Sequence, residues 1–216
     1  MLLLLAVGAI LYFCYTKMYV GDTAQNTEQG TYDGDCPPEG NAKEYEVQQL
    51  NKLKNKALAP SDSNFNGEVT VAKLLAPGND RDRWSVNKGA EISGYVAAVK
   101  VGGVETCNCK TKDPEHRDTH IELVLDPMNE GTTSKVIVEV TPRIRQAMAA
   151  KGEDWSTRAL RDKLLGRWIK VKGWMLFDEE HERQADNTAP NNPRNWRGTC
   201  WEIHPVTSIE VIDRPI

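Results

Sequence analysis

Five short runs rich in β-branched and apolar residues are the feature that most constrains the fold of this chain. Three of them, EISGYVAAVKV, THIELVLD and KVIVEV, lie between residues 90 and 140. Two more, RWIKVKGWMLF and CWEIHPVTSIEVI, follow residue 166. Gly, Asp, Asn or Pro separates the runs, as is typical of strands. Short strands in a small open sheet would leave edges to protect, whereas a closed barrel removes them. We therefore expect a mainly β domain whose five strands close into a barrel.

The segment between the third and fourth runs predicts helices. Thr141 and Pro142 supply an N-cap and a first-turn proline, and a helical stretch follows over residues 142–150. Ser156 can cap a second stretch, TRALRDKLL, which Gly166 ends. The expected order is three strands, a helical insert and two further strands.

This order, together with the glycine-flanked run GRWIKVKGW, resembles the OB-fold, a five-stranded Greek-key barrel. The resemblance covers residues 90–213. The chain also looks similar to uncharacterised bacterial exported or membrane-anchored OB-like proteins, and this resemblance implies no established activity. An OB-like fold implies a ligand site across the second and third strands. The first-to-second-strand loop and the fourth-to-fifth-strand loop would flank that site.

The N-terminal residues 1–20 predict a hydrophobic segment. Residues 2–16 contain no charged residue, and the apolar character resumes after Lys17. A span of this length just suffices to cross a hydrocarbon core of roughly 30 Å. We expect an uncleaved transmembrane anchor, with a signal peptide or a buried helix as alternatives. The segment that follows is acidic and lacks Lys and Arg, so the domain is expected on the non-cytoplasmic side of the membrane.

Two further parts connect this segment to the barrel. Residues 21–42 are mostly Gly, Asp, Thr, Asn and Pro, a composition typical of a flexible linker. Residues 43–89 form an expected N-terminal extension. Within it, residues 43–58 predict a short amphipathic helix, and residues 69–76 predict a second short apolar element. We expect the extension to pack on the barrel domain, residues 90–216.

The two long loops hold a set of cysteine and histidine residues. Thiolate and imidazole are preferred zinc ligands, but one residue separates Cys107 from Cys109, which is closer than the usual zinc spacing. We expect no cofactor, with zinc as an alternative. A disulfide between one of these cysteines and Cys200 is the favoured interpretation, and free thiols are a further alternative. The residues considered as metal ligands or disulfide partners are Cys107, Cys109, His116, His181 and Cys200.

A second set of polar residues alternates with core residues on two strands. Outward-facing imidazoles and carboxylates could supply the base of a metal-dependent hydrolase or nuclease. Such alternation is also typical of a half-exposed strand, and the third strand would separate the two pairs. We therefore expect a solvated or hydrogen-bonded strand face, with hydrolysis as the alternative. The candidate catalytic residues are His120, Glu122, Glu202 and His204.

Basic and aromatic residues of the second half could form a ligand-binding path, because OB-folds hold single strands with a cationic groove and stacked aromatic rings. The net charge of −4 and the acidic run at residues 178–180 count against nucleic acid. We expect Trp201 in the core and Trp196 to be accessible. The expected ligand-binding residues are Arg143, Arg145, Lys170, Lys172, Arg194, Trp196 and Arg197.

No motif in the sequence names a reaction. It contains no phosphate-binding GxxxxGK[ST], no HExxH and no GxSxG. We expect a noncatalytic, membrane-tethered, OB-like binding module for an oligonucleotide, a glycan or a protein segment. A metal-dependent hydrolase and a structural envelope protein are the alternatives.

Overall fold

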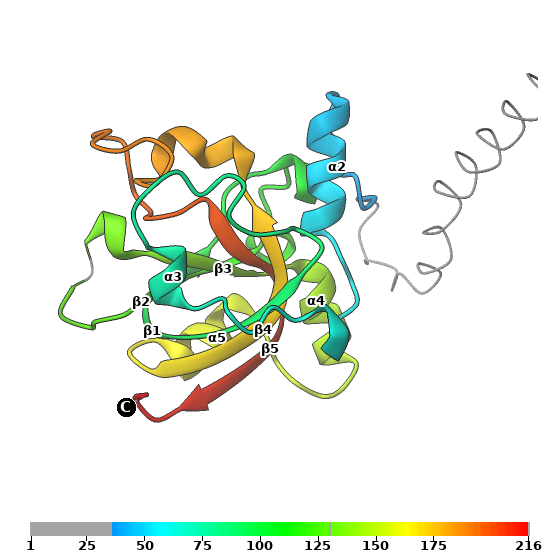
Figure 1. Ribbon diagram of the computed structural model, residues 1–216. Coiled ribbons are helices and arrows are strands. Elements are labelled where there is room, and N and C mark those ends of the chain that lie inside the picture. The colour runs from blue at the N-terminus through cyan, green and yellow to red at the C-terminus, as the bar shows by residue number, and fades with distance from the viewer. Residues whose placement is uncertain (1–35, 130, 216) are drawn as a thin grey trace, which may run out of the picture. The chain divides into compact units, whose positions relative to one another are not determined.

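The five predicted strands form a closed barrel in the computed structural model, which describes residues 36–129 and 131–215 (Figure 1). The order around the barrel is β1-β2-β3-β5-β4. The β3–β5 pair is parallel and the other pairs are antiparallel. This topology is compatible with an OB-like fold. The strands are β1 (Gly89–Val101), β2 (Thr119–Val124), β3 (Val136–Val140), β4 (Trp168–Phe177) and β5 (Trp201–Ile212).

Two helices lie between β3 and β4, as the sequence predicts. The Thr141 hydroxyl accepts a hydrogen bond from the backbone N–H of Ile144 at the start of α4 (Pro142–Ala149). Ser156 caps α5 (Thr157–Leu164) in the same way. Gly166, with a φ of +73°, follows α5 in the left-handed conformation that favours glycine.

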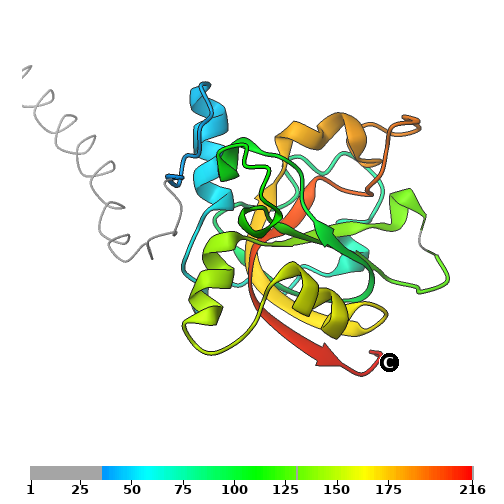
Figure 2. The ribbon, with the colours of Figure 1, turned by 180° about the vertical axis from the view of Figure 1, so that it is seen from behind.

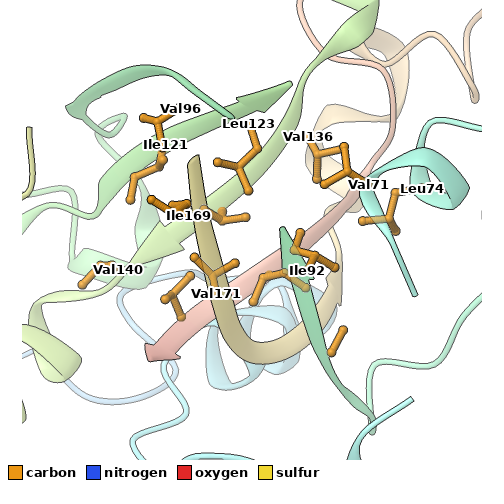
Figure 3. Packing of buried hydrophobic residues seen from close by; sticks show 14 of the residues in the cluster. Val71, Leu74, Ile92, Val96, Ile121, Leu123, Val136, Val140, Ile169 and Val171 are labelled. Carbon is orange, nitrogen blue, oxygen red and sulfur yellow. The ribbon is translucent and has the colours of Figure 1, made fainter. Parts of the chain in front are cut away.

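The N-terminal extension contains α2 (Tyr45–Lys54) and α3 (Val71–Leu74). Val71 and Leu74 are buried in the same core as the barrel strands (Figure 3). Short 3₁₀ turns occupy several connections, at Asp62–Asn64, Thr106–Asn108, Pro114–His116, Thr132–Ser134 and Glu179–Gln184.

The core fills the barrel with inward-facing aliphatic side chains from all five strands. Figure 3 labels members of this core from β1, β2, β3 and β4. Ile121 and Leu123 of β2 face inward, as their alternation predicts, and Trp201 is buried. Gly173 allows β4 and β5 to approach, because a Cβ there would lie 2.3 Å from the backbone oxygen of Pro205. This glycine coincides with an irregularity in the β4–β5 register.

The connections at the two ends of the barrel differ. The β4–β5 loop, the β1–β2 loop and α2 lie at one end, and α5 and the C-terminal end of β5 lie at the other (Figures 1 and 2). This arrangement places both long loops beside the same end of β2, β3 and β5.

A disulfide joins Cys36 to Cys109 of the β1–β2 loop, with Cα atoms 5.7 Å apart and a sequence separation of 73. The predicted pairing of Cys107 or Cys109 with Cys200 is wrong, since Cys107 and Cys200 are both free and buried. The pairing was not predictable because Cys36 lies within the segment interpreted as linker. The backbone N–H of Asn41 also donates to the Thr106 carbonyl, so residues 36–42 are held against this loop.

None of the helices in the described part of the chain is both long and apolar enough to span a bilayer. The predicted anchor at residues 1–20, and residues 21–35 of the predicted linker, lie outside the described residues.

Candidate functional site

The outer face of β2, β3 and the start of β5 is covered rather than solvated. His120 and Glu122 of β2 expose 7% and 4% of their surface, and Glu202 and His204 of β5 expose 3% and 1%. Of the two expected states of this face, solvated or hydrogen-bonded, these side chains adopt the hydrogen-bonded one. The alternation was identified correctly, but the two long loops and α2 cover these side chains.

Strand register brings the two predicted pairs together through Glu139. His120 lies opposite Glu139 in the β2–β3 ladder, and Glu202 lies beside β3 in the parallel β3–β5 pair. His120 Nδ1 lies 2.7 Å from Glu139 Oε1. His204 Nδ1 lies 3.4 Å from Glu139 Oε2 and 3.1 Å from Glu202 Oε2. The third strand thus joins the two pairs that it was expected to separate.

The two imidazoles and the carboxylate between them stabilise one another's charged forms. Burial opposes protonation of His120, but the carboxylates of Glu122 and Glu139 outweigh it and raise the pKa to about 9. Burial likewise opposes protonation of His204, but Glu202, Glu139 and Asp118 raise its pKa to about 9. Burial opposes ionisation of Glu139, yet His120 and His204 lower its pKa to about 2. These shifts favour the cationic forms of both histidines and the anionic form of Glu139.

A second group of ion pairs lies beside the first. Arg197 is fully buried, and its Nη1 lies 2.6 Å from Glu202 Oε1 and 3.3 Å from Asp178 Oδ2. His181 Nδ1 lies 2.5 Å from the same Asp178 oxygen. Burial opposes ionisation of Asp178, but Lys54, His181 and Arg197 hold its pKa well below the usual range.

Lys54 of α2 connects these ion pairs to the β1–β2 loop. Its Nζ lies 2.7 Å from Glu105 Oε2 and 3.9 Å from Asp178 Oδ1. Burial lowers the pKa of Lys54, but the carboxylates of Asp178 and Glu105 outweigh that effect and raise it well above its usual value. The buried ammonium thus fixes α2 to both long loops.

These side chains surround a cleft of about 240 Å³, which we call the central cleft. Trp196 of the β4–β5 loop is half-buried in its wall, with its ring centroid 5.7 Å from that of His120 and 5.4 Å from that of His181. The cleft lies between the β1–β2 and β4–β5 loops. The charged residues that line it are Lys54, Lys100, Glu105, His120, Glu139, Asp178, His181 and Glu202.

Asp118, the residue before β2, is buried beside Glu105 and Glu139, which line this cleft. Burial, reinforced by Glu139 and Glu105, raises its pKa to about 7 although His204 opposes the shift. Asp118 Oδ2 accepts a hydrogen bond of 3.0 Å from the Asn108 side chain. Asp118 Oδ1 and His204 Nε2 are buried and have no hydrogen-bond partner. Such orphaned buried atoms cost free energy unless something else satisfies them.

The structure does not bring the predicted ligand-binding residues into one groove. Arg143 and Arg145 are buried on α4, where Arg143 Nη2 donates to the Cys36 carbonyl. Lys170 and Lys172 of β4 pair with Glu210 and Glu91 on the barrel surface. Arg194 lies in the β4–β5 loop beside a separate surface hollow.

Two residues of that set belong to the site. Arg197 is fully buried in ion pairs, so it does not reach a ligand directly. Trp196 lines the central cleft and is the predicted ligand-binding residue with the best access to it.

The cysteine and histidine residues predicted as metal ligands also lie apart. Cys109 is in the disulfide, Cys200 lies beside the Thr188 hydroxyl, and His116 pairs with Asp113 at the surface. Two other groups have ligand geometry among the described residues. The members of these groups are Glu105, Cys107 and Asp118 in one, and Asp118, Glu139 and His204 in the other.

Five charged residues that line the cleft were not among the predicted site residues: Lys54, Lys100, Glu105, Glu139 and Asp178. Glu139 carried a usable signal, since a single carboxylate within the apolar run KVIVEV is costly to bury without a partner. No sequence signal marked Lys54 as a site residue, because a lysine on an amphipathic helix is ordinarily solvated.

No known protein family matches this sequence, and none of the curated proteins matches it. The resemblance to bacterial exported or membrane-anchored proteins therefore has no support from sequence comparison. The barrel topology stands on the structure alone.

Proposed function

We propose that this protein is a noncatalytic binding module that holds a neutral, hydroxyl-rich ligand, such as one ring of a glycan, in the central cleft. The observation that carries this proposal is the position of the cleft. It lies between the two loops that flank the ligand face of OB-like barrels, with Trp196 in its wall.

The charges of the cleft favour a neutral ligand over an oligonucleotide. The lining cations are already engaged, Lys54 by Glu105, Lys100 by Glu122 and His181 by Asp178. Proteins bind nucleic acids with cations that neutralise the phosphates. The cations of this cleft are already paired and lie beside four carboxylates, so they attract phosphates only weakly. A sugar ring instead uses donors and acceptors together with one aromatic face, and the cleft provides all three.

The raised pKa values of the two histidines favour a binding role over a role in proton transfer. A general base works best when its pKa lies near the operating pH. The pKa values of His120 and His204 are near 9, so both imidazoles are protonated at neutral pH and neither acts as a base. The carboxylates beside them hold both charged imidazoles in place, which suits the orientation of a bound ligand.

Trp196→Ala tests this proposal. The full chain is titrated by calorimetry against neutral oligosaccharides of glucose, mannose and N-acetylglucosamine, and against oligothymidylate. We expect one class of oligosaccharide to bind, and Trp196→Ala to weaken it by about 10-fold or more, since stacking on an aromatic ring is worth about 1–3 kcal/mol. Trp168→Ala is the matched control, because Trp168 packs against Tyr95 away from the cleft.

Binding that survives Trp196→Ala would place the ligand elsewhere. Binding of oligothymidylate alone, with a steep dependence on salt, would replace the glycan by a single-stranded nucleic acid.

Metal-dependent hydrolysis is the second candidate function. It is favoured by one observation, the joining of His120, Glu122, Glu202 and His204 through Glu139. Turnover of a bound oligosaccharide in the calorimeter, lost in His204→Gln, would favour it over simple binding.

A further inference from the structure

We propose that Asp118, Glu139 and His204 bind a divalent transition-metal ion of the zinc class at the base of the central cleft. One ligand atom from each of these residues lies within 4.8 Å of the others, and all three residues are buried. This inference goes beyond the proposed binding function and does not depend on it.

The orphaned atoms of the site are those that a metal would use. His204 Nε2 has no hydrogen-bond partner and lies 3.9 Å from Asp118 Oδ2. Asp118 Oδ1 is also without a partner. Both residues are at least 98% buried, so water does not compensate these atoms by simple exposure. A cation between them would satisfy both.

Neighbouring side chains already hold two of the three ligands in position. A metal-bound histidine ordinarily donates its other ring N–H to a carboxylate, which fixes its tautomer. His204 Nδ1 lies 3.1 Å from Glu202 Oε2, so the ion would replace the proton on Nε2, and that proton is released to solvent. Glu139 is held in turn by His120 Nδ1 at 2.7 Å. Two of the three ligands are therefore oriented before any ion arrives.

The donor set selects the class of ion. One imidazole with two carboxylates suits zinc and its first-row neighbours, which bind nitrogen and oxygen at about 2.0–2.2 Å. Ligand atoms at such distances lie at most about 4.4 Å apart, so the group has to contract slightly on binding. Three protein ligands leave a coordination position open. Because Glu139 lines the central cleft, that cleft gives the ion its route of entry.

The alternative group, Glu105, Cys107 and Asp118, is less suited to a metal. Glu105 already binds the buried ammonium of Lys54 at 2.7 Å. The Cys107 thiol donates to a carboxylate of the same group, since its Sγ lies 3.5 Å from Glu105 Oε2, the oxygen that Lys54 also binds. Because both groups share Asp118, the test has to separate them.

The test uses the purified full chain, stripped of metal with a chelator and dialysed against Zn²⁺ or Co²⁺. We expect one ion per chain by elemental analysis. Asp118→Asn and His204→Gln should each weaken Zn²⁺ binding by at least about 100-fold, and Glu202→Gln by about 10–100-fold, because Glu202 orients the His204 ring. His181→Gln is the matched control, because it removes an imidazole from the same cleft without touching the three ligands.

Two further arms keep the result decisive. Cys107→Ser should leave binding unchanged, and the Co²⁺ spectrum should lack the near-ultraviolet absorption of a cobalt–thiolate bond. Trp196→Ala should also bind Zn²⁺ normally, which separates this inference from the glycan proposal. Circular dichroism checks the fold of each variant, and if His204→Gln does not fold, the near-isosteric Asp118→Asn decides.

Three outcomes would overturn the inference. They are a wild-type chain that retains no Zn²⁺ or Co²⁺, binding that is unchanged in Asp118→Asn, and binding that is lost in Cys107→Ser with a cobalt–thiolate band.

Discussion

At the scale of single residues, the site depends on Arg197, a guanidinium with no exposed surface in a domain of modest size. Burying an ion costs several kcal/mol, and only nearby opposite charges offset that cost. Arg197 meets Asp178 and Glu202, and its Nε also donates to the Thr199 carbonyl at 2.6 Å. The arginine thus links the β4–β5 loop to the first residues of β5.

Replacing Arg197 by Ala should therefore destabilise the protein strongly. The change leaves two buried carboxylates without their cation, and breaking a buried pair from one side costs about 3–5 kcal/mol. Urea unfolding of the full chain measures the loss. Arg158→Ala is the control, because Arg158 is 91% exposed on α5 and 4.0 Å from Asp162, and it should leave the free energy of unfolding nearly unchanged. Equal stability of the two variants would show that the Arg197 pairs contribute nothing.

The sequence indicated several residues of this site, but it did not predict that other parts of the chain cover them. His120 and Glu122 could be assigned to the outer face of a strand, because alternation with period two requires no knowledge of the partner strand. Whether that face is solvated depends on α2 and the two long loops, whose packing has no periodic signal. The cation Lys54 meets the carboxylates of Glu105 and Asp178 through tertiary contacts, so no local pattern could pair them.

At the scale of secondary structure elements, local sequence signals were sufficient to predict the strands and the helices between β3 and β4. The predicted caps Thr141 and Ser156 both accept the hydrogen bonds that their positions require, and all five strand runs became strands. Gly166 and Gly173 mark places where the backbone needs a residue without a side chain. These features are local in sequence, which is why the helical insert and the strand order could be predicted.

Removing the cap of α5 tests this local control. Ser156→Ala takes away the oxygen that accepts from the backbone N–H of Ala159 at 3.2 Å, and it should cost about 1 kcal/mol of unfolding free energy. Ser156→Asp keeps an acceptor at the same place and should stay close to wild type in the same urea titration. A loss of equal size in both variants would mean that the hydroxyl acts through something other than the cap.

At the scale of the whole molecule, the covered face of the barrel depends on a segment that begins far away in sequence. The disulfide holds Cys36 to the β1–β2 loop, and Asn55 at the end of α2 donates hydrogen bonds to the Pro38 and Cys107 carbonyls. Lys54 then extends from the same helix end to both long loops. The extension therefore closes one side of the central cleft, and its attachment is a property of the fold rather than of any one element.

Breaking the disulfide should consequently loosen the extension and lower global stability. A crosslink spanning 73 residues restricts the unfolded chain, and the chain-entropy model gives about 4 kcal/mol for a loop of this length. We expect a reductant to lower the urea midpoint of the wild-type chain and to have no effect on the Cys36→Ser, Cys109→Ser double variant, which should already unfold at the lower midpoint. Hydrogen exchange should show faster amide exchange in α2 of that variant, because its anchor near Lys54 is weakened. A midpoint that does not respond to the reductant, with Cys36 and Cys109 shown to be reduced, would mean that the noncovalent contacts alone hold the extension in place.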